Sequence, residues 1–172
     1  MEIRTKRLVL KPMSMEYLHT VHAYASDPET TRYMMCLPNE KLEETERFVR
    51  GAEAAWGKDP PEFCEFAVLL DGAHIGAASV YPSEQPGEAE VGWILDRAHW
   101  GHGYAAEAAR AAMDYAVSRL GVRRFIAHCD AGNDASRRVM EKLGMRFVSC
   151  EGGRKNRSSD EERMELMYEL RV

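Results

Sequence analysis

The first third of the chain changes from an alternating pattern to helical spacing. Apolar and charged positions alternate over Ile3–Leu10, which predicts a first strand. Ser14 has the side chain of an N-cap, so a helix is expected to follow it. Apolar residues recur at helical spacing over Asn39–Gly57 and predict a second helix, and Pro60 and Pro61 end the helical pattern.

The middle of the chain has the period of two that is typical of strands. Phe63–Leu70, Ala73–Tyr81 and Glu88–Leu95 predict three strands. Asp71-Gly72 joins the first two as a tight turn, and Pro82–Gly87 joins the second to the third. Because connections this short link antiparallel neighbours, the three strands are expected to form a meander.

The last part of the chain alternates between helix and strand. In chain order, the pattern predicts helix Tyr104–Leu120, strand Arg123–Cys129, helix Asn133–Leu143, and strands near Met145–Cys150 and Arg163–Val172. Gly152–Glu161 is polar and is expected to be a mobile loop. One strand–helix–strand crossover within an antiparallel sheet predicts an α+β fold rather than a doubly wound one. The length of 172 residues suits one domain spanning residues 1–172.

Composition limits the cellular locations and the binding partners that are expected for this chain. The net charge of −5 argues against nucleic acid as a partner and suits a cationic substrate such as an amine. The first residues lack the apolar run of a signal peptide or a membrane span, so no membrane partner and a cytoplasmic location are expected. No metal site is expected, because Cys36, Cys64, Cys129 and Cys150 are scattered and His19, His22, His74, His99 and His128 lack metal-ligand spacing. The cysteines are expected to be reduced, mostly buried thiols, and the histidines to be structural or surface residues.

Val91–Ala109 is the most informative stretch, because an apolar strand, a short glycine loop and an alanine-rich helix follow one another. Gly101 and Gly103 have no side chain to hold a ligand away from the backbone. The helix expected to begin near Tyr104 presents unpaired N–H groups and the positive end of its dipole. This stretch therefore predicts an anion site that suits the pyrophosphate of a large cofactor.

Three blocks carry a family resemblance: Thr5 to Pro12, Trp100-Gly101-His102-Gly103-Tyr104-Ala105, and Asn133 to Gly144. The block that begins at Trp100 is similar to an Arg/Gln-x-x-Gly-x-Gly/Ala pyrophosphate loop, with Trp100 in place of the Arg or Gln. The block that begins at Asn133 is similar to an Asn-x-x-Ser…Glu-Lys-Leu-Gly-Phe signature. Together the blocks resemble the GNAT superfamily of acetyl-CoA-dependent N-acetyltransferases, and within it the branch of the ribosomal-protein N-terminal acetyltransferases. The resemblance covers nearly the whole chain.

This resemblance implies a mixed, mostly antiparallel sheet of about seven strands, with helices on both faces and a splayed central parallel pair. Acetyl-CoA, as co-substrate, would lie between the splayed strands, here Glu88–Leu95 and Arg123–Cys129. Main-chain groups of the first strand would pair with the pantetheine arm, and Ser136 would approach the sulfur. The residues that the resemblance assigns to the cofactor are Ile94, Leu95, Trp100, Gly101, His102, Gly103, Tyr104, Ala105, Asn133 and Ser136.

Acetyl transfer to nitrogen needs a neutral amine, and the pKa of an α-amine is about 8 and that of lysine about 10.4. A base is therefore required, and Glu90 is the candidate because alternation places it with Gly92 and Ile94 on one face of its strand, with Glu88 in reserve. Ser136 is the candidate for stabilising or protonating the departing thiolate. The reaction expected is direct attack by a primary amine, without a covalent enzyme intermediate.

Each assignment has a structural alternative. Glu90 could be a solvated strand residue, and Asn133 could serve as a helix N-cap alone. Trp100 and Tyr104 could be aromatic core residues where the loop meets the helix. The His102 imidazole could point either to a phosphate or to water.

Other functions and the acceptor stay open at this level. Gly101–Ala106 also satisfies the Gly-x-Gly-x-x-Ala pattern of dinucleotide-binding oxidoreductases, and a domain that binds acetyl-CoA without catalysis, as a sensor or scaffold, would keep the same loop. The acceptor could be the N-terminus of a ribosomal protein or other peptide, a polyamine or a small-molecule amine, depending on Met15–Trp56, Pro82–Gly87 and Gly152–Glu161. The final strands are compatible with a monomer or a homodimer.

Overall fold

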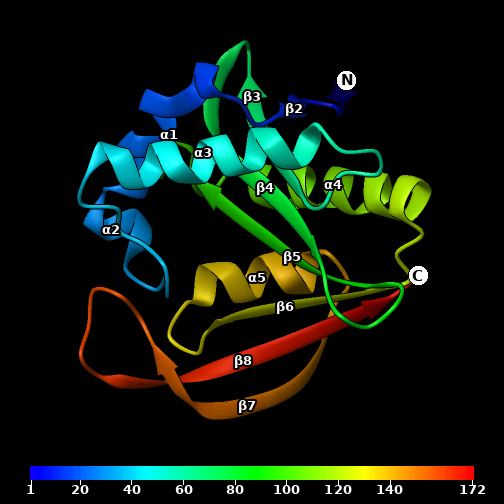
Figure 1. The fold of residues 1–172 in the computed structure, drawn as a ribbon. Helices are drawn as coiled ribbons and strands as arrows, with labels where there is room; N and C mark the ends of the chain where they lie inside the picture. The colour runs from blue at the N-terminus through cyan, green and yellow to red at the C-terminus, as the bar shows by residue number, and fades with distance from the viewer.

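The computed structural model describes residues 1–172 and contains one eight-stranded sheet, in the order β1-β2-β3-β4-β5-β6-β8-β7 (Figure 1). All neighbouring strands are antiparallel except the parallel pair β5 and β6. The strands are β1 (Ile3–Arg4), β2 (Leu8–Pro12), β3 (Cys64–Leu70), β4 (Ala73–Pro82), β5 (Glu88–Leu95), β6 (Arg124–Asp130), β7 (Arg146–Lys155) and β8 (Glu162–Arg171). The predicted α+β fold and the predicted meander are confirmed.

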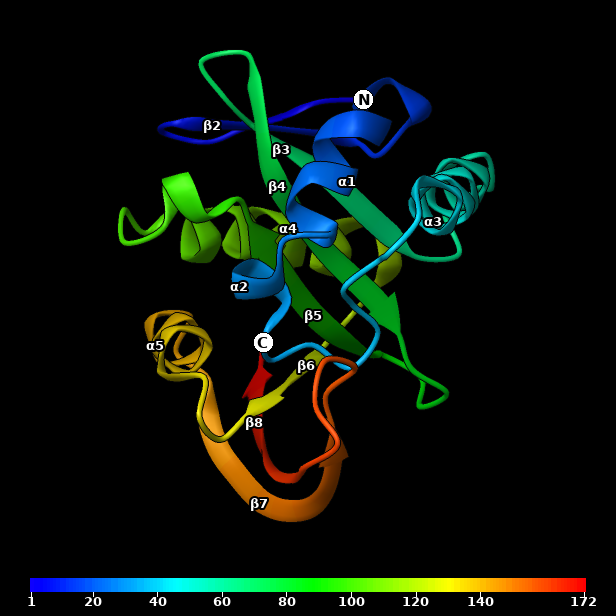
Figure 2. The same ribbon diagram turned by 90° about the vertical axis from the view of Figure 1, so that its left-hand side faces the viewer.

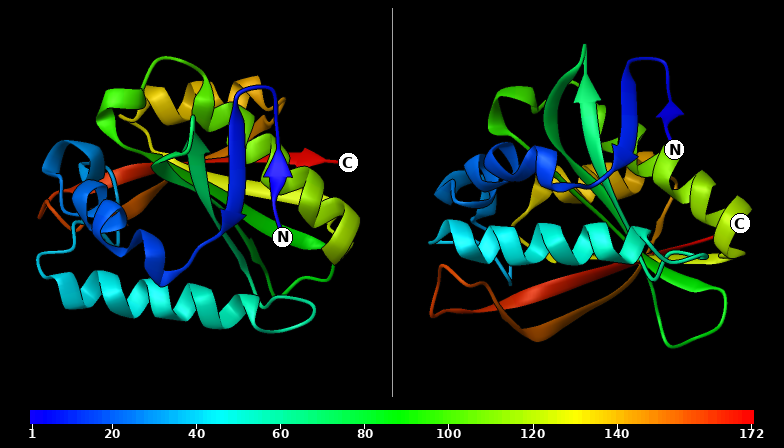
Figure 3. Two further views of the ribbon diagram at one scale, coloured as in Figure 1. Left: turned by 90° about the horizontal axis from the view of Figure 1, so that it is seen from above. Right: turned by 45° about the horizontal axis from the view of Figure 1, so that its top comes forward.

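The helices form two layers, one on each face of the sheet. They are α1 (Leu18–Ala25), α2 (Pro28–Thr31), α3 (Leu42–Trp56), α4 (Tyr104–Leu120) and α5 (Asp134–Lys142), with 3-10 turns η1 at Met15–Tyr17 and η2 at Arg97–His99. Figure 2 and the left view of Figure 3 show α1 and α3 on one face, and α4 and α5 on the other. None of the helices combines the length and the apolar character that crossing a membrane requires.

Each layer has its own apolar core. On one face, α4 buries a stripe of small residues, including Ala108, Ala112 and Ala116, at the spacing of one helix side. Because these side chains are short, α4 packs closely on β4 and β5 within a cluster of 24 buried residues. On the other face, α1 and α3 enclose a second cluster of 10 buried residues, among them Val21 and Val49.

The N-terminal strand is the first correction to the sequence analysis. Ile3–Leu10 is not one strand but a hairpin, in which the Thr5 N–H donates to the Leu8 carbonyl at 2.9 Å. The Leu8 N–H in turn donates to the Thr5 hydroxyl, also at 2.9 Å. The Thr5 side chain stabilises this turn, which divides the predicted strand into β1 and β2 and gives the sheet eight strands.

The segment before α3 departs from the predicted pattern in three places. Ser14 makes no side-chain cap bond, and η1 precedes α1. A short helix, α2, was not predicted, although Asp27 caps it by accepting from the Thr30 N–H at 2.8 Å. Asn39 lies outside α3 and is buried, and its amide donates to the Thr45 hydroxyl at 2.9 Å.

The predicted loop Gly152–Glu161 is largely tied down. Its first four residues belong to β7, which extends to Lys155. Arg154 and Asn156 are both buried, at 9% and 4% exposure. Two irregularities in the β7–β8 register, one of them between Glu151 and Arg154, conceal the strand period from sequence analysis.

The pairing of β5 with β6 ends after three residue pairs, of which Glu90 and Ile126 are the last. Beyond them, β5 is paired with β4 alone and β6 with β8 alone, and Figure 1 shows the two strands diverging. We call residues 91–95 of β5 and 127–130 of β6 the splay. A dinucleotide-binding oxidoreductase fold would need a run of parallel strands, so this topology argues against that alternative.

A buried carboxyl group lies away from the splay, on the face of the sheet that α1 and α3 cover. Glu65 on β3 is 4% exposed and accepts a hydrogen bond from the Tyr81 hydroxyl at 2.6 Å. Burial raises the pKa of the Glu65 carboxyl to about 7, and the hydrogen bond from Tyr81 opposes that rise only in part. Ionisation of Glu65 is therefore coupled to folding.

We expect Glu65→Gln to remove part of the pH dependence of stability. A carboxyl whose pKa is higher in the folded state contributes stability that is complete below pH about 4.5 and is lost as the pH rises through about 7. The full difference corresponds to about 3 kcal/mol. Glutamine still accepts from Tyr81 and cannot ionise, so between pH 5 and 8 the wild-type protein should lose more stability than the variant.

Urea denaturation at pH 5, 6.5 and 8 measures this difference. Glu84→Gln, in an exposed loop, is the matched control and should follow the wild-type protein. An unchanged pH dependence in Glu65→Gln would show that the Glu65 carboxyl is not desolvated as described.

Candidate active site

The loop between η2 and α4 has the backbone of an anion site. Gly101 and Gly103 adopt φ values of 79° and 81°, a left-handed conformation that favours glycine. Gly103 is the N-cap of α4, and no side chain caps the helix, so the N–H groups of its first turn face outward. A Cβ atom on Gly101 would meet nothing within 4 Å. The loop therefore has open space beside donors at the positive end of a helix dipole.

Arg7, on the N-terminal hairpin, contacts this loop, which sequence analysis did not predict. Glu107, in the first turn of α4, accepts from the Thr5 hydroxyl at 2.6 Å and from the backbone N–H and Nε of Arg7 at 2.9 and 2.7 Å. Arg7 Nη1 also donates to the His102 carbonyl at 2.9 Å. Burial acts to raise the pKa of Glu107, but the hydrogen bonds from Thr5 and Arg7 hold it below its ordinary value. The N-terminal hairpin thereby brings the Arg7 guanidinium, in an ion pair with Glu107 at 2.7 Å, to the glycine loop.

Three aromatic side chains surround the loop. The Trp100 indole N–H donates to the Leu95 carbonyl at 2.8 Å, and its side chain remains 42% exposed. Trp100 therefore ties the loop to the end of β5 and is not a core residue. His102 stacks on Tyr104 with ring centres 5.5 Å apart, and the Arg7 guanidinium lies 4.5 Å from the centre of the Tyr104 ring.

The free edge of β5 is formed by different residues from those expected. The Asp96 N–H donates to the Ile75 carbonyl of β4 at 2.9 Å. Backbone groups of alternate residues face the same edge, so those of Ile94 also face β4. Trp93 and Leu95 face the splay instead. The structure thus gives Trp93, rather than Ile94, the main-chain groups that could pair with an extended ligand, with Leu95 beside it.

The start of α5 lies at the end of β6. The Asn133 side-chain carbonyl accepts from the Ser136 N–H at 3.0 Å, which makes Asn133 the N-cap of this helix. Ser136 is half-buried in the first turn. Contact of either residue with a ligand stays a prediction, and no hydrogen bond joins Ser136 to Glu90.

Glu90 is paired with a histidine that sequence analysis interpreted as structural. His128 Nδ1 lies 2.9 Å from Glu90 Oε1, and the two side chains are 27% and 47% exposed. The hydrogen bond to Glu90 raises the pKa of the His128 imidazole above its ordinary value. Glu88, the reserve base, is unsuitable because it is buried in an ion pair with Arg124, which also contacts Glu169 at 2.7 Å.

The other nearby carboxylates are neutralised by arginines. Glu165 pairs with Arg154, and Asp130 accepts from Arg163 at 3.1 Å. Of the carboxylates on β5, on β6 and on the part of β8 paired with β6, Glu90 alone therefore lacks an arginine partner. A negative charge without a guanidinium partner remains at the base of the splay.

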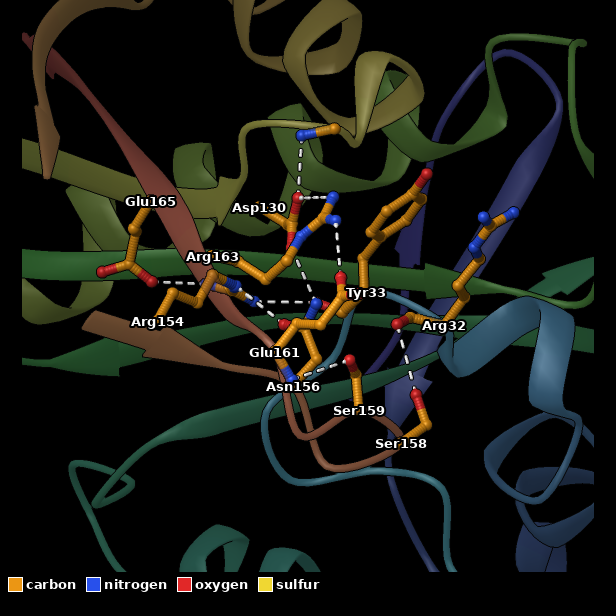
Figure 4. Close-up of polar contacts among 11 residues, drawn as sticks. Arg32, Tyr33, Asp130, Arg154, Asn156, Ser158, Ser159, Glu161, Arg163 and Glu165 are labelled. Carbon is orange, nitrogen blue, oxygen red and sulfur yellow. Dashed lines mark hydrogen bonds and ion pairs between the residues drawn. The ribbon is translucent and has the colours of Figure 1, made fainter. Parts of the chain in front are cut away.

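Asp130 is the centre of a buried polar network at the other end of β6 (Figure 4). Asp130 accepts hydrogen bonds from Arg163 and from the Asn156 amide, the latter at 2.7 Å. Arg154 donates to the Asn156 side-chain carbonyl at 3.0 Å and to the Tyr33 backbone carbonyl at 2.8 Å. Burial acts to raise the pKa of Asp130, but the hydrogen bonds from Arg163, a backbone N–H and Asn156 hold it below its ordinary value. The network fixes the β7–β8 connection against the end of β6.

The same connection is bound to residues 32–36, which follow α2. The Arg157 N–H donates to the Met34 carbonyl at 3.0 Å, and its Nη1 donates to the Cys36 carbonyl at 3.2 Å. Arg157 Nη2 donates to Glu44 at 2.8 Å, and this bond lowers the pKa of Glu44 to about 2. Parts of two segments that the sequence analysis linked to the choice of acceptor thus lie side by side, and we call residues 32–36 and 154–158 the clasp.

Alternative chemistry has little support in the described residues. Burial raises the pKa of the Cys129 thiol to about 11, so it is a poor nucleophile near neutral pH. No group of three or more histidine, cysteine or acidic side chains is arranged to hold a metal ion.

Comparisons with known proteins agree with this architecture. Residues 7–146 match the model of the acetyltransferase (GNAT) domain. The uncharacterized N-acetyltransferase YnaD of Bacillus subtilis (strain 168) is 32% identical over 157 residues, which cover 87% of this chain and 88% of YnaD.

Two solved structures are similar over the whole chain. A GNAT-family acetyltransferase from Bacillus anthracis is 28% identical with a TM-score of 0.84, covering 99% of this chain and 98% of its own. The ribosomal L7/L12 α-N-protein acetyltransferase RimL, in complex with coenzyme A, shares the fold at 18% identity with a TM-score of 0.86, covering 100% and 98%. The chain belongs to the GNAT family of acetyltransferases and is an N-acetyltransferase by family.

Proposed function

We propose that this protein transfers the acetyl group of acetyl-CoA to a primary amine by direct attack. The observation that carries the proposal is the position of Glu90, a carboxylate without an arginine partner, at the base of a splay whose far end adjoins a glycine loop suited to phosphate. One end of this arrangement suits a phosphorylated donor and the other suits a cation. A solved structure of RimL contains coenzyme A, and that of a more distant neighbour with the same fold contains acetyl-CoA. Both support the choice of acetyl-CoA as the donor.

In this proposal the residues of the loop and of β5 hold the donor. The N–H groups of residues 101–105 bind the pyrophosphate, and the Arg7 guanidinium, which pairs with Glu107 and donates to the His102 carbonyl, lies beside them. Main-chain groups of Trp93 and Leu95 bind the pantetheine arm as a further strand would. Trp100 already occupies the Leu95 carbonyl, so Trp93 supplies more of this pairing.

At the other end, Glu90 attracts the ammonium group of the acceptor and receives its proton, directly or through a neighbour. The neutral amine nitrogen then bonds to the acetyl carbonyl carbon, and the bond from that carbon to sulfur breaks. Ser136, in the first turn of α5, donates a hydrogen bond to the departing thiolate. Asn133 holds that turn as its N-cap.

The acceptor is proposed as a class, a primary amine, rather than as one molecule. One structural neighbour modifies the N-terminal serine of the 50S protein L7/L12 in Salmonella typhimurium, which is an amine of this class. Peptide N-termini, polyamines and small-molecule amines all carry the charge that Glu90 would attract. The clasp borders the end of the splay and would distinguish among them.

Release of coenzyme A from acetyl-CoA in the presence of an amine panel tests the function. The panel contains peptides with free N-termini, spermidine, lysine and an aminoglycoside, and the released thiol is measured by colour formation. We expect amine-dependent release with at least one acceptor. Tight binding of acetyl-CoA in calorimetry with no turnover of any amine would instead favour the sensor or scaffold alternative.

Arg7→Gln is expected to weaken acetyl-CoA binding about tenfold, because it removes the guanidinium and leaves the Glu107 carboxylate without its ion-pair partner beside the glycine loop. Calorimetric titration with acetyl-CoA measures the Kd. Arg4→Gln is the control, since Arg4 is 74% exposed and pairs with Glu2. Equal Kd values for the two variants would remove Arg7 from the donor site.

Ser136→Ala is expected to lower kcat at least tenfold while leaving the Kd of acetyl-CoA within about twofold, because the hydroxyl acts on the leaving group. Ser118→Ala, on α4 away from the splay, is the control, since its hydroxyl bonds only to the Tyr115 carbonyl. An unchanged kcat in Ser136→Ala would remove the proposed serine role.

A further inference from the structure

His128 occupies a particular place on the splayed strands. Glu90 and Ile126 are the last pair of the parallel ladder, so their side chains lie on the same face of the sheet. Side chains alternate along β6, and His128, two residues after Ile126, therefore returns to that face. It is the first β6 residue on this face beyond the stretch that is paired with β5.

The hydrogen bond to Glu90 determines which imidazole nitrogen is free. A carboxylate has acceptors only, so the Nδ1 atom at 2.9 Å from Glu90 Oε1 carries the proton and donates it. In the neutral ring, Nε2 then has a lone pair and can accept a proton. No hydrogen bond within the chain uses Nε2, and the side chain is 27% exposed.

The charges around His128 come from three strands. Glu90 on β5 provides the hydrogen bond. The charge of Glu165 on β8 raises the pKa of His128, and that of Arg154 on β7 lowers it. Glu165 and Arg154 pair with each other, which leaves Glu90 as the dominant neighbour. Its hydrogen bond outweighs the effect of burial, so the pKa of His128 lies above its ordinary value.

We propose that His128 Nε2 takes the proton from the acceptor ammonium and that Glu90 orients the imidazole and stabilises its charged form. This inference rests on the proposed acetyl transfer. It makes His128 a catalytic residue and Glu90 the residue that positions it. An imidazole suits the task better than an ordinary carboxyl, because a general base works best when its pKa lies near the working pH.

The protons balance in this scheme. The ammonium N–H bond breaks, its electron pair stays on nitrogen, and the proton forms the second N–H bond of the His128 ring. The amine nitrogen bonds to the carbonyl carbon, the carbon–sulfur bond breaks, and the electron pair leaves with sulfur. The second proton of the amine passes to the thiolate through the Ser136 hydroxyl. The imidazolium then releases its proton to water, so one proton appears for each acetyl group transferred.

Steady-state kinetics with the acceptor found above tests His128 directly. His128→Ala should lower kcat/KM for the amine by about 10²-fold or more, leave the Kd of acetyl-CoA unchanged, and recover activity when imidazole is added. His19→Gln, an exposed histidine on α1, is the control and should match the wild-type enzyme. Loss of activity without any rescue by imidazole, or no loss at all, would contradict the proposal.

The pH dependence of kcat/KM distinguishes the titration of His128 from the titration of the amine substrate. One limb should keep the same pKa for amines of different basicity and should move to lower pH in Glu90→Gln, because the interaction that raises the pKa of His128 is lost. A limb that follows the amine alone would contradict the proposal.

A third measurement needs no substrate. The ring nitrogen signals of His128, followed by NMR against pH, should titrate above about 6.5 in the wild-type protein and lower in Glu90→Gln. Equal titration in both would contradict the pair itself. If the pair titrates as expected and the wild-type enzyme acetylates no amine, the proposed function fails and this inference fails with it; an active enzyme that tolerates His128→Ala contradicts this inference alone.

Discussion

The rest of the structure depends on one loss of pairing, between β5 and β6 after Glu90 and Ile126. Backbone N–H and C=O groups in a sheet are costly to leave unpaired when buried, so an interrupted ladder in the middle of a sheet needs either water or a ligand. Here the interruption leaves the backbone N–H and C=O groups of Trp93 at an open edge of β5. It also places Glu90 in the last pair of the ladder and His128 just beyond it, so that their side chains can approach a third group.

Arginine side chains connect neighbouring segments at both ends of the splay. Arg124 on β6 contacts Glu88 of β5 and Glu169 of β8, where the parallel ladder is still intact. Arg154 links the β7–β8 connection to residue 33, on the far side of the splay. Guanidinium groups suit this role, because several fixed donors can join carboxylates and carbonyls at once. Their presence also explains why Glu90, which they leave out, is chemically distinct.

Periodicity was sufficient for the elements that frame the site and insufficient for the contacts within it. The predicted bounds of Glu88–Leu95 and Tyr104–Leu120 agree with β5 and α4, because one has a clear period of two and the other a stripe of alanines and capping glycines. Arg7 and Glu107 are 100 positions apart, and no local pattern joins them. The backbone groups of Ile94 face β4 rather than the splay, and alternation along a sequence does not indicate which edge of a strand is free. His128 belongs to no local motif, because its partner Glu90 lies 38 positions away on a neighbouring parallel strand.

The clasp shows how the acceptor side can vary while the fold is preserved. Arg154 and Arg157 donate to main-chain carbonyls of residues 33 and 36, and the Arg157 N–H donates to that of residue 34. Carbonyl groups are the same whatever side chain a residue carries. The side chains of residues 32–36 can therefore change without removing the hydrogen bonds that place them. Because these bonds are independent of side-chain identity, the position of residues 32–36 and the chemistry of their side chains are separate properties. The glycine loop and the Glu90–His128 pair, in contrast, depend on particular residues.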